Sequence, residues 1–346
     1  MASRPTLEVV AREAGVSKAT VSKVINGRDD VGPATRERVQ AVIAALGYMP
    51  TTGRRTPAAP TVTVLFDAVV NLYSAQVLSG VVTAGIEQAV DVVVTHLPAG
   101  PGPGALSPAW FRSVAARGHL GVIVVTTEMS AQQVRSCASA GLGLVAIDPV
   151  SIDPSSTDRM VSVSGTNWSG GLQATEHLLG LGHRRIGFAG GPVASRPAEQ
   201  RLHGHLAALG SRGVPRDDAL VLREGFAYED GVRMAERLLS LPEPPSAVVA
   251  GCDASALGVM AAARARGLRL PQDLSIVGFD DTYAAEWTAP QLTTVRQPMV
   301  EMGRVALRTV LRLAHGDRPD THHFELATSL VVRASTGPPA VPAQPA

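Results

Sequence analysis

Residues 6–27 read TLEVVAREAGVSKATVSKVING, and this stretch divides into two short helical segments joined at a glycine. One helical face of the first segment carries small and apolar side chains at Leu7, Val10, Ala11 and Ala14. Gly15 suits the left-handed exit from that helix, and Ser17 suits the N-cap of the next one. The pattern predicts a helix-turn-helix.

A third helix is predicted to follow this pair. Pro33 fits its first turn, and Gly47 fits its end. Between them, apolar residues recur at helical spacing at Val39, Val42, Ile43 and Leu46. Three such helices would give residues 1–50 an all-α head with a small core. The alternative is a small helical bundle with no role in binding nucleic acid.

The second helix has an outer face that suits DNA. If Val21 and Val24 point to the core, the opposite face presents hydroxyls and amines to phosphates and base edges. We expect Lys18, Ala19 and Lys23 to read bases. The side chains expected to position the DNA backbone are Thr6, Ser17, Thr20, Ser22 and Asn26. Residues 1–60 carry nine Lys/Arg against five Asp/Glu, whereas the whole chain has a net charge of +1, so positive charge gathers in the head.

The composition indicates a large globular protein. With 346 residues, the chain exceeds the size that one hydrophobic core usually supports. Its 45% hydrophobic and 18% charged residues are typical of neither disordered nor fibrous chains. No apolar run reaches the roughly 18 residues of a membrane helix, and the N-terminus lacks the apolar stretch of an export signal. We therefore expect a cytoplasmic protein with no membrane partner.

The region after residue 60 is predicted to be α/β. Short β-branched runs such as VTVLF, GVIVVT, GLVAID and LSIVGFD alternate with helical segments. Runs of this kind are buried on both faces in parallel sheets with crossover helices.

No constellation of catalytic residues stands out. The chain has no G-x-S-x-G, no Walker loop and no H-E-x-x-H. The histidines of His203-Gly204-His205 and His322-His323 lack partners at metal-ligand spacing, so we interpret them as surface residues. Two cysteines are too few for a zinc site or a disulfide framework. We expect a protein that is not an enzyme and that has no metal or other cofactor.

The head resembles the LacI/GalR family of bacterial repressors. The resemblance rests on T-L-x-x-V-A-x-x-A-G-V-S-x-x-T-V-S-K-V-I-N-G, followed by V-x-x-x-T-R-x-R-V and L-G-Y-x-P. It implies a homodimer that binds a near-palindromic operator, with the second helix in the major groove. It also implies a hinge, here residues 51–60, that enters the minor groove.

The hinge departs from the family pattern. Residues 50–57 read PTTGRRTP, with Gly53 inside the expected helix and Pro57 in place of the usual leucine wedge. Both residues disfavour a helix at these positions. We therefore expect weaker kinking of the operator and more reliance on Arg54 and Arg55, which could equally be solubilising residues.

The body resembles the effector-binding core of the same family, which is related to type I periplasmic binding proteins. The resemblance is carried by LLGLGHRRIGFAGGP, LSIVGFDD, LTTVRQPMVEMGR and ELATSLVVRAST. It implies two doubly wound parallel-sheet lobes with a ligand between them. We place lobe one at 61–163 and 294–324, and lobe two at 164–293 and 325–336. Residues 337–346 are expected to be a disordered tail without the leucine repeats of a tetramer bundle.

The resemblance implies a sugar-like effector. Arg201 and Asp280 match the family residues that hold effector hydroxyls, although they could instead be a structural ion pair. Tyr73 stands where relatives carry an aromatic residue that stacks on the sugar, and Cys252 replaces a usual asparagine. The aromatic candidates could equally be core residues. The full set of expected effector residues is Asn71, Tyr73, Trp168, Arg201, Phe226, Cys252, Asp280 and Gln297.

The leading hypothesis is an effector-controlled transcriptional regulator, a repressor of carbohydrate-utilisation genes. One alternative is a sugar-binding protein or sugar-converting enzyme that merely has an α/β body. Deletion of residues 1–57 discriminates the two, because a regulator would lose operator binding and keep ligand binding. Another alternative is an architectural DNA binder whose pocket has decayed, and a ligand-dependent thermal shift would reject it.

Overall fold

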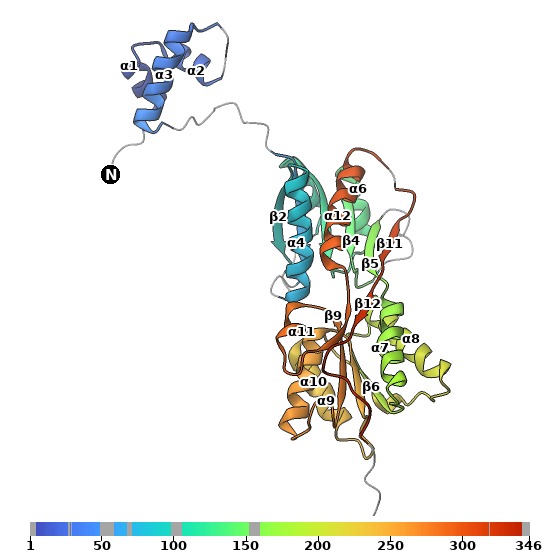
Figure 1. Ribbon diagram of the computed structural model, residues 1–346. Helices are drawn as coiled ribbons and strands as arrows, with labels where there is room; N and C mark the ends of the chain where they lie inside the picture. The colour runs from blue at the N-terminus through green and yellow to red at the C-terminus, as the bar shows by residue number, and fades with distance from the viewer. Residues whose placement is uncertain are drawn as a thin grey trace, which may run out of the picture. The chain divides into compact units, whose positions relative to one another are not determined.

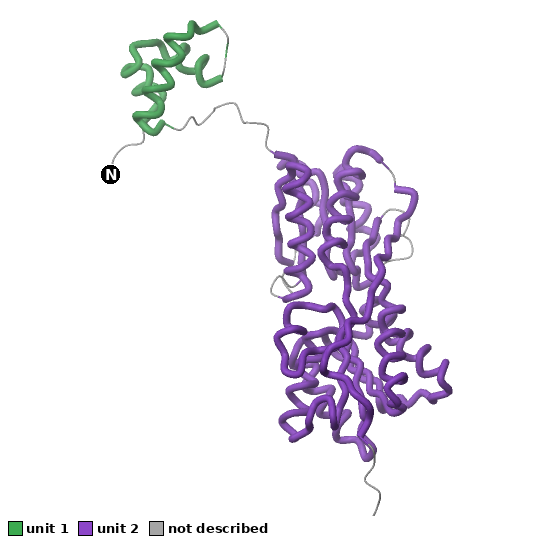
Figure 2. Tube along the Cα trace, viewed as in Figure 1, with its two compact units in different colours: residues 1–58 green, residues 59–346 purple. Residues whose placement is uncertain are grey.

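The computed structural model describes residues 5–26, 28, 30–48, 59–67, 71–97, 106–151, 160–317 and 319–340. The chain divides into two compact units, residues 1–58 and 59–346 (Figure 2). The predicted hinge from residue 51 to 58, with Arg54 and Arg55, lies outside the described residues.

The first unit is a bundle of three helices, α1 (Leu7–Glu13), α2 (Lys18–Ile25) and α3 (Pro33–Leu46). Gly15 has a φ of +63° after α1, and Gly47 has a φ of +60° after α3. Both glycines therefore adopt the left-handed conformation expected of them. The helices share one small core, made of Val10, Ala11, Ala14, Val21, Val24, Val31, Val39 and Tyr48.

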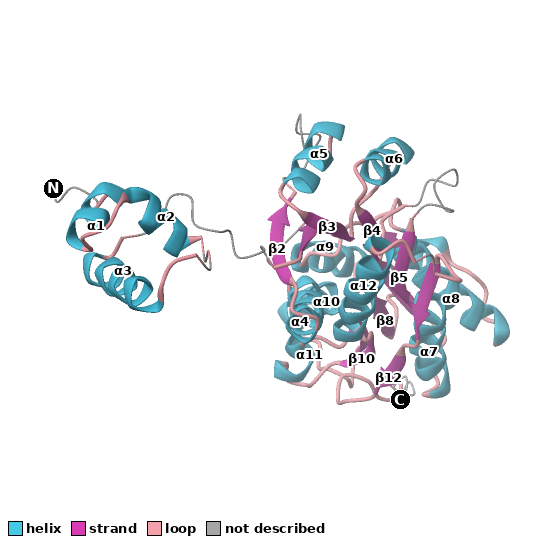
Figure 3. Cartoon of the chain, turned by 90° about the horizontal axis from the view of Figure 1, so that it is seen from above, coloured by secondary structure: helices cyan, strands magenta, loops and turns pink. Residues whose placement is uncertain are grey.

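The first lobe of the second unit contains a six-stranded parallel sheet with the strand order β11-β5-β4-β3-β1-β2. Helices α4 and α12 pack on one face and α5 and α6 on the other (Figure 3). The strands are β1 (Thr61–Phe66), β2 (Asp91–His96), β3 (His119–Val125), β4 (Gly143–Ile147), β5 (Val161–Gly165) and β11 (His323–Leu326), and the helices are α4 (Leu72–Glu87), α5 (Pro108–Ala116), α6 (Ala131–Ser139) and α12 (Met299–Ala314).

The second lobe repeats this plan around a sheet with the order β12-β10-β9-β8-β6-β7, in which only the β10–β12 pair is antiparallel. Helices α7 and α8 cover one face, and α9 and α10 cover the other (Figure 1). The strands are β6 (Ile186–Gly190), β7 (Val221–Arg223), β8 (Ala247–Ala250), β9 (Ser275–Asp280), β10 (Thr293–Arg296) and β12 (Ser329–Val331), and the helices are α7 (Asn167–Gly180), α8 (Arg196–Ser211), α9 (Tyr228–Leu238), α10 (Asp253–Ala265) and the short α11 (Tyr283–Trp287).

The chain passes between the lobes three times, after β5, after β10 and after β11. These crossings differ from the expected lobe boundaries. Residues 294–324 were expected to lie in lobe one, but β10 pairs with β9 in the second sheet, so the chain crosses only at Gln297 and Pro298. Likewise, β5 and β11 run to Gly165 and Leu326 in the first sheet, beyond the expected limits of 163 and 324.

The disordered tail was expected to begin at residue 337, but the structure shows ordered contacts at this position. Gly337 N donates to Ser275 Oγ at 3.0 Å, and Gly337 O lies 2.9 Å from His183 Nε2. These contacts hold the start of the tail on the second lobe. Residues 341–346 lie outside the described residues.

Paired glycines allow three helix pairs to pack unusually closely. A Cβ built on Gly204 in α8 would lie 2.0 Å from Trp168 O in α7, and one on Gly171 in α7 would lie 2.2 Å from Arg201 O in α8. The same reciprocal arrangement joins α4 to α12 and α9 to α10, through Gly80 with Gly303 and Gly231 with Gly258. Because the obstructing atoms are backbone, a side chain at these sites would force the helices apart.

We predict that Gly204→Ala lowers the free energy of unfolding by about 1–3 kcal/mol through overpacking against α7. Gly210→Ala is the matched control in the same helix, because a Cβ there meets nothing within 4 Å. The control should be neutral or stabilising by up to about 1 kcal/mol. Denaturant unfolding of both variants measures the difference, and equal effects would contradict this account of the helix packing.

Candidate functional site

In the head, α2 presents the face that the sequence predicts. Val21 and Val24 are buried, whereas Lys18, Ala19 and Lys23 are exposed. The other candidates on this helix are exposed at Ser17 and half-buried at Thr20, Ser22 and Asn26. The predicted orientation of the helix is therefore confirmed, while the DNA contacts stay predictions.

Several hydroxyl and amide candidates also hold the helices together. Thr6 accepts a hydrogen bond from Val9 N and Ser17 accepts one from Thr20 N, which makes both residues N-caps. Asn26 Nδ2 donates to Ser22 O at 2.8 Å at the end of α2. Substitution of these residues would therefore weaken the head as well as any contact with phosphate.

The two lysines of α2 pair with carboxylates of the head. Lys18 contacts Glu8 of α1, and Lys23 Nζ lies 2.6 Å from Asp30 Oδ2. The lysines hold the pKa of each of these carboxyls below its usual range. All four side chains are exposed, so solvent screens both pairs and each contributes little to the stability of the head.

Sequence reasoning overlooked one structural arginine in the head. Arg38 Nε donates to Ala14 O at 3.1 Å and so ties α3 to the C-terminal end of α1. The carbonyls at a helix end need such donors, but Arg38 lies in α3, two helices after α1, so no local signal in the sequence marked this contact.

In the body, Arg201 on α8 is buried at 5% exposure. Its Nε donates to Asn167 Oδ1 at 2.8 Å, and its Nη1 donates to Gly251 O at 2.5 Å. The guanidinium carbon lies 3.8 Å from the centre of the Phe279 ring, and Nη1 lies 3.8 Å from Asp280 Oδ1. This set of partners compensates for the burial of a permanent charge.

Asp280 ends β9 with 6% exposure. Its Oδ1 accepts a hydrogen bond from Gln297 Nε2 at 2.8 Å, on the segment that crosses between the lobes. Burial raises the pKa of Asp280 to about 7, and the neighbouring charge of Arg201 opposes the rise. The structure thus brings together Arg201, Asp280 and Gln297, three of the predicted effector residues.

The first lobe contributes a tyrosine and a carboxylate. Tyr73, in the first turn of α4, donates from its hydroxyl to Asp148 Oδ2 at 2.6 Å. Asp148 follows β4 with 3% exposure, and its Oδ1 has no hydrogen-bond partner among the described residues. Burial raises the pKa of Asp148, while the charge of Arg201 lowers it. The carboxyl of the first lobe therefore interacts electrostatically with the guanidinium of the second.

The four remaining predicted effector residues differ in how close the structure places them to Arg201. Phe226 is half-buried, and its ring centre lies 5.9 Å from the Arg201 guanidinium. Cys252 caps α10, its Sγ donates to Phe226 O at 3.2 Å, and burial raises its thiol pKa to about 12. Asn71 is the N-cap of α4. Trp168 is 45% exposed on α7.

Two members of this cluster were missed by sequence reasoning, Asp148 and Asn167. The signal for Asp148 was available, because it follows the buried run GLVAI just as Asp280 ends SIVGFD. Carboxyl ends of parallel strands gather at one edge of each sheet, where ligands usually bind. Asn167 had no such signal, since only the fold brings it to Arg201.

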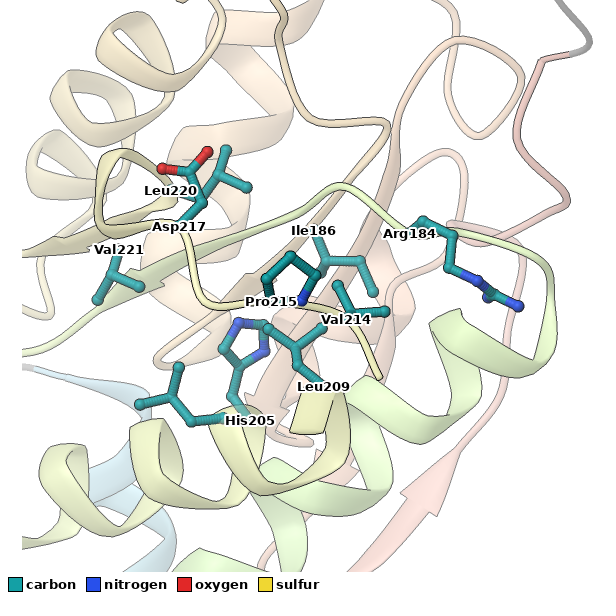
Figure 4. A pocket seen from close by; sticks show the side chains of 10 residues that line it. Arg184, Ile186, His205, Leu209, Val214, Pro215, Asp217, Leu220 and Val221 are labelled. Carbon is teal, nitrogen blue, oxygen red and sulfur yellow. The ribbon is translucent and has the colours of Figure 1, made fainter. Parts of the chain in front are cut away.

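One expectation about histidine is wrong. His205 was expected at the surface, but it is 1% exposed and its Nδ1 lies 2.9 Å from Thr175 Oγ1 on α7. Burial lowers the pKa of His205 to about 4, so the ring is neutral. It borders a cavity of about 20 Å³ in the second lobe (Figure 4), which has room for a water molecule and not for a sugar.

Neither a metal cluster nor a membrane helix emerges from the part of the chain that the structure describes. No group of three or more His, Cys, Asp or Glu there is arranged to hold a metal ion. Within the same residues, every helix is too short or too polar to cross a bilayer.

Comparison with known proteins agrees with the architecture. The family of bacterial regulatory proteins named lacI matches residues 6–51, and the periplasmic binding protein-like domain matches residues 175–336. The HTH-type transcriptional regulator CelR of Thermobifida fusca is 34% identical over 341 residues, which cover 96% of this chain and 98% of that protein.

Solved structures show the same likeness. A complex of CelR with cellobiose has a TM-score of 0.72 at 33% identity and covers 96% of this chain and 100% of its own. A lac repressor dimer bound to operator and the anti-inducer ONPF has a TM-score of 0.76 at 27% identity, with 97% and 100% covered.

A helix-turn-helix head and a two-lobed periplasmic-binding-protein-like body define a DNA-binding transcriptional regulator. The chain belongs to the lacI family of bacterial regulatory proteins, since it shares 34% identity with CelR over nearly its whole length. The predicted family and fold class are confirmed. The relatives are named regulators, so the expectation of a protein that is not an enzyme is confirmed as well.

The raised pKa of Asp280, about 7, predicts a pH-dependent stability. Between pH 5 and 7 the folded state keeps a proton that the unfolded chain releases, so the free energy of unfolding falls as pH rises. Asp280→Asn should remove about 2 kcal/mol of that fall between pH 5 and 7. Denaturant unfolding at pH 5, 6 and 7 measures it.

Asp273→Asn is the control, because Arg269 lowers the pKa of Asp273 to about 2 and the carboxyl stays ionised over this range. A fall in stability that is identical in Asp280→Asn and the wild type would show that Asp280 titrates normally.

Proposed function

We propose that this regulator represses carbohydrate-utilisation genes and that a small sugar-like effector, bound between the two lobes, controls its affinity for a near-palindromic operator. The observation that carries the proposal is the buried polar cluster to which both lobes contribute. Tyr73 and Asp148 come from the first lobe, Arg201 and Asp280 from the second, and Gln297 from a crossing segment.

The chemistry of the cluster suits a polyol. Asp148 Oδ1 and Gln297 Oε1 are buried oxygens without a hydrogen-bond partner in the described chain, and buried acceptors are normally satisfied. Ligand hydroxyls would donate to both oxygens. The guanidinium of Arg201 would donate to ring or hydroxyl oxygens, and the half-buried Phe226 ring offers an apolar face to a sugar.

Entry of the effector requires the lobes to part. The cluster side chains Asp148, Arg201, Asp280 and Gln297 are each at most 6% exposed. Beside them, Arg196 N of the second lobe donates to Val150 O of the first lobe at 2.8 Å. We infer that effector binding shifts the balance between open and closed lobes, and that a head dimer reads this shift through its spacing on the operator.

Relatives support both halves of the proposal. CelR has been solved with cellobiose and the lac repressor dimer with operator. In the head of this chain, we propose that Lys18, Ala19 and Lys23 contact base edges. The short polar side chains of the same region would contact phosphates, namely Thr6, Ser17, Thr20, Ser22 and Asn26.

We predict that the purified homodimer captures genomic fragments with a near-palindrome beside sugar-uptake or glycosidase genes, and that a pool of sugars changes its occupancy. Salt must be fixed, because non-specific affinity varies steeply with it. Lys23→Ala should weaken binding to the captured operator about ten-fold or more, since one base or phosphate contact is lost. Sequencing of the captured DNA and titration of the operator measure these outcomes.

Arg112→Ala, which removes an exposed cation of the body, is the control for loss of one positive charge and should leave operator affinity unchanged. Capture of no enriched sequence, with or without sugars, would overturn the proposed repressor function.

We predict that cellobiose or another mono- or disaccharide raises the melting temperature of the wild type, since a ligand of the folded state stabilises it. Asp148→Asn should reduce the affinity for the active sugar about ten- to hundred-fold, because the amide replaces a charged acceptor of hydroxyl hydrogens. Asp273→Asn, at a half-buried carboxylate that pairs with Arg269, should bind normally. Thermal-shift measurements and calorimetry test these expectations. If no sugar raises the melting temperature of the wild type, the effector is not a sugar.

A further inference from the structure

The turn that carries Asp280 has an unusual backbone. Asp280 has a φ of +112° and Asp281 a φ of +57°, so two consecutive residues other than glycine lie at positive φ. Such conformations persist only where the surrounding structure enforces them. The contacts of this turn therefore show what enforces its shape.

Two arginines hold the carboxylate of Asp281, which is 5% exposed. Arg296 Nε donates to Asp281 Oδ2 at 2.6 Å, and Arg333 Nη2 lies 2.7 Å from Asp281 Oδ1. Next along the turn, Thr282 donates from N and Oγ1 to Asp253 Oδ2 at 2.6 and 2.9 Å. The turn is thus fixed from α10, from the end of β10 and from the segment after β12.

Both arginines lie in the second lobe, on chain that is continuous with a crossing between the lobes. Arg296 ends β10 and directly precedes the crossing at Gln297, whereas Arg333 follows β12, the strand that begins directly after the crossing at Thr328. Gln297 itself donates from N to Asp280 O at 3.2 Å and from Nε2 to Asp280 Oδ1 at 2.8 Å.

The three crossings are also in contact with one another. Thr328 N donates to Thr166 Oγ1 at 2.9 Å, which joins the crossing after β11 to the crossing after β5. A Cβ on Gly165 would lie 2.4 Å from Gln297 Oε1 and 3.3 Å from Thr328 Cγ2. A displacement of one crossing therefore acts directly on the other two.

We propose that Asp281 is a positioning residue. Through Arg296 and Arg333 it links the strained turn at the end of β9 to β10 and to the segment after β12. The strands β10 and β12 lead into and out of crossings between the lobes. Asp280 then moves with those crossings. A ligand that binds Asp280 and shifts it therefore also shifts the crossings between the lobes. Asp281 transmits this displacement without contacting the ligand.

Hydrogen exchange of the full-length protein without ligand tests this proposal. Asp281→Asn removes the charge and keeps a residue type that tolerates positive φ, so the backbone preference is retained. We expect exchange to become about ten-fold faster or more in peptides containing Thr282, Gln297 and Arg333, because a charge-assisted contact is lost from each neighbouring segment. Peptides from β6 and β8 should keep wild-type exchange.

The matched control is Asp273→Asn, which breaks the exposed ion pair with Arg269 in the same lobe. It should leave exchange in the three peptides unchanged. Arg296→Gln removes only one arm of the contact and should give a smaller increase in the same peptides. This variant also keeps the test decisive if Asp281→Asn folds poorly. Unchanged exchange in both variants, or an equal increase throughout the second lobe, would overturn the proposal.

A second measurement rests on the proposed function. Calorimetric titration with cellobiose should show about ten-fold weaker binding by Asp281→Asn than by the wild type, although Arg201, Asp280 and Gln297 are all retained. Wild-type affinity in the variant would contradict a positioning role. Absence of binding by the wild type would instead count against cellobiose as the effector, and the exchange experiment alone would then decide the role of Asp281.

Discussion

The buried guanidinium of Arg201 constrains the arrangement of the second lobe. Removal of a permanent charge from water is costly unless hydrogen bonds and close polar or aromatic groups replace the lost hydration. The replacements come from Asn167 at the start of α7, Gly251 after β8, the Phe279 ring and Asp280 at the end of β9. These ends must therefore converge, and their convergence creates the polar edge at which a ligand is expected.

The head could be predicted closely because its determinants are local. A left-handed glycine, a capping hydroxyl and an apolar repeat each act within one helical turn, and Gly15, Ser17 and Gly47 do what their residue types favour. The ion pair of Lys18 with Glu8 was not predicted, because it depends on the angle between α1 and α2.

The body could be predicted in class and less well in detail. Alternation of buried strands and helices is a repeating signal, so the parallel sheets were foreseeable. Strand partners are chosen over long distances, and β10 was assigned to the wrong lobe because its pairing with β9 leaves no mark in its own residues. Arg201 and Asp280 were predicted from a family resemblance, whereas Asp148 and Asn167 became evident only through their contacts.

The internal ion pairs of the head affect how its binding to DNA should respond to ionic strength. Each lysine of α2 already has a carboxylate counterion in the free protein, Glu8 for Lys18 and Asp30 for Lys23. Added salt weakens the attraction to phosphate, but it also loosens these internal pairs and so frees the lysines. The two effects oppose each other, so affinity should decline more gently with salt than a count of cations on the recognition face would suggest. If the proposed contacts of Lys18 and Lys23 with DNA hold, carboxylates within the head would thus make its affinity for DNA less sensitive to the ionic strength of the solution.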